Sequence, residues 1–115
     1  MQKFCAKTKN PLNAIKQNLI AQIVERLKKR YNPEKVILFG SYAKGLNDEN
    51  SDMDFFIVKN TKKNMIERLR EVSALFLDRR IGMDFVIYTP EELRQRIQMN
   101  DVFVQDILKE GKILL

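Results

Sequence analysis

Hydrophobic residues recur along the first third of the chain at intervals of three or four, which is the spacing of one helix face. Asn10-Pro11 precedes the pattern, with a capping residue followed by a proline suited to the first helical position. Asn32-Pro33 ends it. The pattern predicts a helix of about five turns whose apolar stripe packs in the core. The stripe consists of Leu12, Ile15, Leu19, Ile23, Leu27 and Tyr31.

Three later segments are short, unbroken apolar runs, and they predict strands. They cover residues 35–39, 53–58 and 83–88. A run of this kind suits a strand that is buried on both faces. One or two helices can cover one face of such a sheet. The other face then needs the C-terminal segment or another chain, unless the chain's own helices cover both faces.

A helix is predicted between the second and third strands. Thr61 can cap it, and it continues to about Arg80, where Ile81-Gly82 ends the pattern. Its buried side is expected to consist of Met65, Leu69, Val72 and Phe76.

Two helices and a short strand are predicted after the third strand. Thr89 and Glu92 have the spacing of a capping box, with a proline at the first helical position. A last helix follows over residues 100–110, and Gly111 is suited to ending it. The alternative is that both helices form one long bent helix. Residues 112–115 are apolar enough for a short edge strand.

The order of these elements predicts an α/β fold with a small mixed sheet of three or four strands and helices packed mainly on one side. At 115 residues the chain is long enough for a single domain, expected over 10–115, after a flexible N-terminal segment over 1–9. No stretch approaches the roughly 20 apolar residues of a membrane span or has the pattern of a secretion signal. A cytoplasmic protein without membrane contact is therefore expected.

The composition narrows the chemistry open to this chain. The chain has no histidine and a single cysteine, Cys5, which excludes histidine-based acid–base catalysis and an internal disulfide. Catalysis must then rely on carboxylates, lysines, hydroxyls or a bound metal. The formal charge of +6 comes from clusters that suit solvated helix faces or the attraction of a polyphosphate. Basic and aromatic residues do not alternate, so no direct contact with nucleic acid is expected.

Three aspartates are the candidate catalytic and metal-binding residues. Asp52 and Asp54 lie two positions apart at the start of a strand, which places both carboxylates on one face. Like charges this close favour a bound cation, and oxygen ligands suit Mg²⁺ or Mn²⁺. Asp84 stands in an apolar strand, where a lone carboxylate would be costly unless it joined the other two or lay near solvent at the strand edge. Three carboxylates in one patch would form a site for two metal ions in phosphoryl transfer.

The loop before these carboxylates contains candidate nucleotide-binding residues. Gly40 lets the backbone approach a ligand closely, and Ser41 could cap a short helix whose N–H groups face a phosphate. Lys44 could reach the same phosphates or simply be solvated. Ser51 could contact the ligand or buttress the carboxylates. The loop is not a P-loop, because Leu46-Asn47 stands where a lysine and a hydroxyl residue are required.

The motif Gly-Ser, ten residues and Asp-x-Asp resembles the signature of the DNA polymerase beta-like nucleotidyltransferase superfamily. It stands here as Gly40-Ser41 followed by Asp52-Met53-Asp54. The chain looks like the minimal nucleotidyltransferases of that superfamily, whose third aspartate matches Asp84. The resemblance covers nearly the whole chain and implies the polymerase beta-like nucleotidyltransferase fold.

This resemblance also implies roles and a partner. Asp52 and Asp54 would hold two Mg²⁺ ions, and Asp84 would ligate one of them and help to deprotonate the attacking hydroxyl. Gly40 and Ser41 would contact the phosphates of ATP. Minimal nucleotidyltransferases are paired with a helical HEPN-family RNase toxin and act as antitoxins by adding AMP to one of its tyrosines. The implied assembly is a hetero-oligomer of the two proteins.

Two other functions fit the same residues. A module of the same fold with a weak or inactive site could neutralise a partner by docking alone. Alternatively, an active site could transfer a nucleotide to a small molecule or an RNA end. The intact Gly-Ser pair and the three aspartates favour the enzyme. The shortness of the chain beyond the catalytic core favours an acceptor on another protein.

Overall fold

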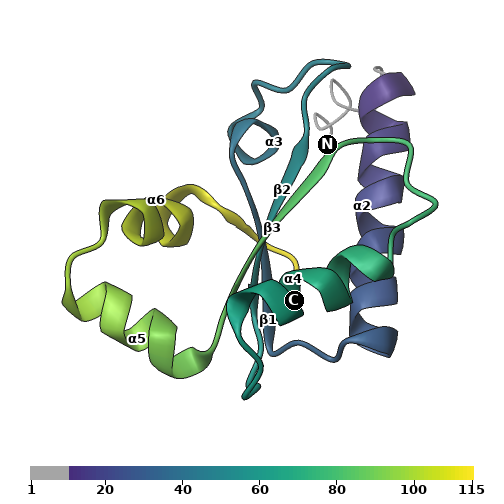
Figure 1. The fold of residues 1–115 in the computed structure, drawn as a ribbon. Helices are drawn as coiled ribbons and strands as arrows, with labels where there is room; N and C mark the ends of the chain where they lie inside the picture. The colour runs from purple at the N-terminus through teal and green to yellow at the C-terminus, as the bar shows by residue number, and fades with distance from the viewer. Residues whose placement is uncertain (1–10) are drawn as a thin grey trace.

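A four-stranded mixed sheet forms the centre of the molecule (Figure 1). The structure, a computed structural model, describes residues 11–115. The strand order is β3-β2-β1-β4, with β1 antiparallel to β2 and to β4, and β2 parallel to β3. The predicted α/β fold with a small mixed sheet is confirmed. The strands are β1 (Lys35–Phe39), β2 (Met53–Val58), β3 (Met83–Tyr88) and β4 (Lys112–Ile113).

Helices flank this sheet, and none of those in the described residues is long and apolar enough to cross a membrane. Three expectations lie outside what the structure describes: the flexible segment 1–9, the capping role of Asn10 and the side chain of Leu12. The helices are α2 (Pro11–Arg30), α3 (Ser41–Lys44), α4 (Met65–Ala74), α5 (Pro90–Gln98) and α6 (Val102–Glu110).

The predicted apolar stripe is fully buried only from Ile23 onward, and Leu19 is partly buried against the core. Ile23, Leu27 and Tyr31 are buried as predicted. Ile15 is 64% exposed, and its neighbour Lys16 is buried instead. The reason is that this end of α2 lies against polar segments, where the Lys16 ammonium donates a hydrogen bond to a backbone carbonyl.

The second predicted helix is shorter than expected, and its buried side was predicted wrongly in part. It begins after Asn64, which forms a capping box with Glu67, and not after Thr61. Met65 and Leu69 are 50% and 44% exposed. The inward position is occupied by Arg68.

Arg68 is buried because its guanidinium has polar partners inside the fold. It donates to Glu92 of α5 at 2.7 and 3.2 Å, and to the backbone carbonyls of Lys63 and Ile87. Glu92 is also part of the capping box with Thr89, so this pair joins α4 to the start of α5. The hydrogen bond and charge of Arg68 keep the pKa of Glu92 below its usual value.

The C-terminal region contains two helices, so the alternative of one bent helix is wrong. Asn100 lies between the two helices, and its backbone is left-handed with φ 57°. Asp101 then caps α6. Gly111 follows α6 as predicted, but its backbone is extended rather than left-handed. Glycine is needed at position 111 because there is no space for a side chain. A Cβ there would lie 2.5 Å from the Ile107 carbonyl oxygen and from Cγ2 of Ile37.

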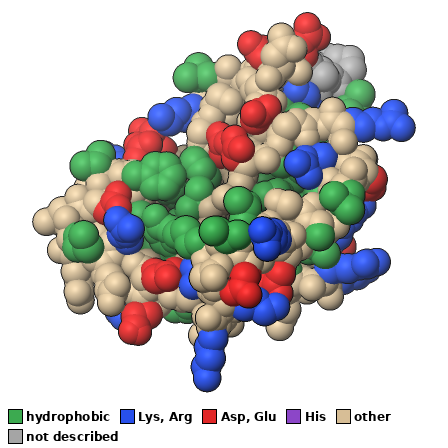
Figure 2. Space-filling view, in the orientation of Figure 1, with side chains coloured by type: hydrophobic (Ala, Val, Ile, Leu, Met, Phe, Trp, Pro, Cys, Tyr) green, Lys and Arg blue, Asp and Glu red, His purple; other side chains and the backbone are tan. Residues whose placement is uncertain are grey.

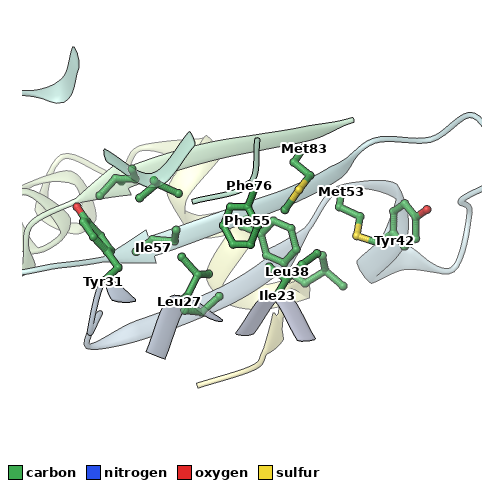
Figure 3. Packing of buried hydrophobic residues seen from close by; sticks show 13 residues of the cluster. Ile23, Leu27, Tyr31, Leu38, Tyr42, Met53, Phe55, Ile57, Phe76 and Met83 are labelled. Atoms are coloured by element: carbon green, nitrogen blue, oxygen red, sulfur yellow. The ribbon is translucent and has the colours of Figure 1, made fainter. Parts of the chain in front are cut away.

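Hydrophobic side chains cover both faces of the sheet. The larger cluster lies between the sheet and helices α2 and α4, and Figure 3 shows it from close by. The smaller cluster packs the opposite face against Val104 and Ile107 of α6. A helix of the chain itself, α6, therefore covers part of the second face, which agrees with the alternative that the chain's own helices cover both faces, and the main helix packing is on the first face. The strand residues of the smaller cluster are Ile37, Phe56, Val58 and Tyr88.

Candidate active site

The strand register gathers the candidate residues at one end of the sheet. Asp54 of β2 pairs with Asp84 of β3 on one side and with Phe39 of β1 on the other. Gly40 directly follows β1, and Asp52 directly precedes β2. The loop after the first strand and the carboxylates of the next two strands therefore lie at the same end of the sheet.

Asp54 and Asp84 are direct partners in the parallel pairing of β2 with β3. Burial, the charge of Asp84, a hydrogen bond between the two side chains and the charge of Asp52 together raise the pKa of Asp54 to about 6. Asp54 is half-buried, whereas Asp52 and Asp84 are exposed. Two carboxylates held this close repel each other when both are ionised, and a cation between them removes that cost.

Two glycines make room for the carboxylates. A Cβ at Gly40 would overlap Oδ2 of Asp54, and a Cβ at Gly82 would overlap Oδ1 of Asp52. Gly40 also has φ 75° and ψ −150°, a conformation open to glycine alone. Gly82 was interpreted from the sequence only as a helix breaker. The signal that could have found its second role is its position directly before the strand that carries Asp84.

The short helix after Gly40 differs in detail from the expectation. Gly40 is its N-cap and Ser41 its first residue, so Ser41 does not cap it. The Lys44 ammonium lies 3.4 Å from Glu110 and 3.8 Å from Asp106, both in α6. In this structure Lys44 is therefore paired with α6.

Ser51 lies in the turn that leads to Asp52. Its hydroxyl accepts a hydrogen bond from the Asp48 N–H and donates to the Asp48 carboxylate. Among the described residues the Ser51 hydroxyl therefore bonds Asp48, and not the carboxylates of Asp52 or Asp54 that it was expected to buttress. Direct contact between Ser51 and a ligand stays a prediction.

The chemistry of the donor set fits a hard divalent cation, because every candidate ligand is a carboxylate oxygen. Within residues 11–115, no three His, Cys, Asp or Glu side chains lie close enough to hold one ion. Asp54 and Asp84 form a pair, and the Asp52 carboxylate lies against Gly82. The pair is the best candidate for the centre of a metal site, and Asp52 flanks it.

Comparisons with known proteins identify the family and several relatives of the chain. Residues 20–114 match the family described as nucleotidyltransferase domain. A Methanocaldococcus jannaschii protein, provisionally named a protein adenylyltransferase, is 30% identical over 100 residues, which are 85% of this chain and 96% of that protein. A second protein of that organism with the same provisional name is 31% identical over 83 residues, 66% of this chain and 56% of that protein.

A solved structure is similar as well. It is the crystal structure of a provisionally named nucleotidyltransferase from Sulfolobus solfataricus. The similarity has a TM-score of 0.53 and 28% sequence identity, and it covers 68% of this chain and 70% of that one. The fold around the candidate site is therefore one that a nucleotidyltransferase also has.

Proposed function

The chain belongs to the nucleotidyltransferase domain family, and from that premise we propose that it is a protein adenylyltransferase acting as an antitoxin. In this proposal it transfers AMP from ATP to a tyrosine hydroxyl of a partner HEPN-family RNase toxin. The observation that carries it is the Asp54–Asp84 pair beside Gly40. The provisional names of two relatives support a protein acceptor, and one of these relatives is matched over 96% of its own length.

The proposed roles follow from where the carboxylates lie. Asp52 and Asp54 would hold two Mg²⁺ ions, or Mn²⁺, and Asp84 would ligate one of them. Bound divalent ions would neutralise phosphate charge and polarise the α-phosphate. Asp84 is exposed near the start of β3, where it can accept the proton of the incoming hydroxyl. The hydroxyl oxygen then forms a bond to the α-phosphorus, the bond to the β-phosphate breaks, and pyrophosphate leaves.

The exposed apolar surface of the α5–α6 hairpin also supports a protein acceptor. Figure 2 shows hydrophobic side chains gathered where this hairpin meets the sheet. Phe103 is 46% exposed and packs edge-on against Phe39, with ring centroids 5.7 Å apart. Phe39 is the neighbour of Asp54 in the sheet. Apolar surface next to a reactive centre is typical of a protein interface. Further exposed members are Ile97, Met99 and Val102.

The direct test is transfer of label from α-³²P-ATP, with Mg²⁺, to the product of the adjacent gene, which the proposal expects to be a HEPN-family protein. Label on the partner that is absent with Asp52→Asn/Asp54→Asn would support the proposal. Neutralisation that survives this double substitution without label would instead identify a docking module. Label on an antibiotic or an RNA end, with no protein present, would identify a different class of acceptor.

The Phe103→Glu variant is expected to weaken transfer to the protein acceptor about 30-fold through a higher KM, which corresponds to the loss of one interface hot spot. The matched control is Ile66→Glu. Ile66 is 64% exposed on α4, which packs on the other face of the sheet. We expect the control to keep wild-type KM for the acceptor. Equal effects of the two substitutions would contradict the assignment of the hairpin as the acceptor surface.

A further inference from the structure

Lys16 is a buried cation next to the proposed nucleotide site. Its side chain is 8% exposed. The ammonium donates a hydrogen bond of 3.1 Å to the Asp48 carbonyl and lies 5.3 Å from the ring centroid of Tyr42. Burying a charge has a free-energy cost that one carbonyl and one aromatic face offset only in part. An apolar side chain would pack there without that cost, so the charge calls for a reason other than core stability.

Segment 46–51 has few other attachments. Among the hydrogen bonds of residues 11–115, those of this segment lie within it or reach Ser41 of the adjacent helix. The bond from Lys16 is the exception, since it spans 32 positions and comes from α2. It therefore ties an otherwise locally held loop to the rest of the fold.

The carbonyl that Lys16 binds belongs to the turn that leads into β2. The same Asp48 oxygen accepts the Ser51 N–H, and the Asp48 carboxylate accepts the Asn50 N–H and the Ser51 hydroxyl. Asp52 is the next residue. A shift of the Asp48 carbonyl would thus be passed to the backbone that positions the Asp52 carboxylate.

The second contact of Lys16 reaches the other half of the site. Tyr42 is the buried residue of α3, the helix that Gly40 caps. Its hydroxyl has no hydrogen-bond partner among the described residues, whereas its ring lies near the Lys16 ammonium. The Lys16 ammonium consequently contacts both segments on which phosphate and metal residues are proposed.

We propose that Lys16 is a positioning residue that holds the Asp48–Ser51 turn and α3 at a fixed distance, and thereby aligns Asp52 with Gly40-Ser41. The proposal rests on the function proposed above, which assigns metal to Asp52 and phosphates to Gly40-Ser41. Residues that orient metal ligands from outside the coordination sphere commonly affect metal affinity by about 10- to 100-fold.

The test compares Lys16→Met, Lys16→Arg and the control Lys29→Met, which removes an exposed lysine from the same helix. Binding of α,β-methylene-ATP with Mn²⁺ is measured by calorimetry, so no acceptor is needed. We expect Lys16→Met to weaken binding about tenfold and to speed amide hydrogen exchange over 46–52, with its melting temperature preserved. Lys16→Arg should largely restore binding, and Lys29→Met should bind like the wild type.

Several results would overturn this role. Unchanged nucleotide binding and unchanged hydrogen exchange in Lys16→Met would do so, as would an equal loss of binding in Lys29→Met or no rescue of binding by Lys16→Arg. An unfolded Lys16→Met chain would also overturn it, because a positioning role requires that the fold survive without the charge. A wild-type protein that binds no nucleotide would count against the proposed function instead. In that case faster exchange over 46–52 in Lys16→Met would still support Lys16 as the anchor of the loop.

Discussion

Replacing Asp54 by asparagine is expected to lower nucleotidyl transfer about a thousandfold and, at the same time, to stabilise the metal-free protein. The loss of activity corresponds to about 4 kcal/mol of transition-state stabilisation, because asparagine has no charge with which to hold a divalent ion. The gain in stability arises because the substitution removes one of two carboxylates that are held together, Asp54 and Asp84. Function and stability therefore make opposite demands on this position.

The stabilisation depends on pH with a definite sign. Folding raises the pKa of Asp54 from 3.8 to about 6, so between these values the folded protein binds a proton that the unfolded chain has released. Stability of the wild type therefore falls as the pH rises through this window. The two-unit shift in pKa corresponds to a loss of about 3 kcal/mol in the free energy of unfolding. Because the side chain is half-exposed, solvent screening reduces this loss to about 1 kcal/mol.

Urea unfolding in EDTA at pH 7.5 and at pH 4 measures this effect. Asp54→Asn should exceed the wild type at pH 7.5 and match it at pH 4. Glu34→Gln, which removes an exposed carboxylate far along the chain from the pair, should show neither change. With Mg²⁺ at millimolar concentration the wild type should gain stability and the variant should not. A variant that is less stable than the wild type in EDTA at pH 7.5 would show that the pair is not a source of strain.

The strands and their carboxylates could be predicted because both depend on local sequence. Short, unbroken apolar runs predict buried strands. In addition, β2 and β3 begin with the same triplet, Met-Asp-Phe. A parallel pairing that matches the two triplets puts Asp54 beside Asp84, and that is the register observed. The spacing from Ser41 to Asp52 then determines which loop stands beside them.

The buried polar residues could not be predicted in the same way. Lys16 and Arg68 occupy inward positions, and each depends on a partner more than 20 residues away, Asp48 and Glu92. A periodic pattern records only whether a side chain is apolar, so it included Met65 in the core and left Lys16 and Arg68 out of it. The pairing of Lys44 with α6 was hidden for the same reason, since it depends on how the last helix packs.

Replacing Gly82 by alanine is expected to lower nucleotidyl transfer about 100-fold without destabilising the fold. A Cβ at this position would overlap Oδ1 of Asp52. The carboxylate is the free end of an exposed side chain, so it can turn away at little cost to stability. A displacement of about 1 Å in a reacting group is, however, enough for a 100-fold loss of rate.

Gly45→Ala is the matched control because its expected effects are the reverse. Gly45 has φ 72°, so alanine there would cost about 1 kcal/mol of stability, yet its Cβ would meet nothing within 4 Å. Transfer rates and urea midpoints measured on both variants should thus separate, with activity lost in one and stability in the other. If Gly82→Ala kept activity within about twofold of the wild type, the Asp52 carboxylate would not need its place against Gly82. In that event Asp54 and Asp84 alone would make up the essential pair.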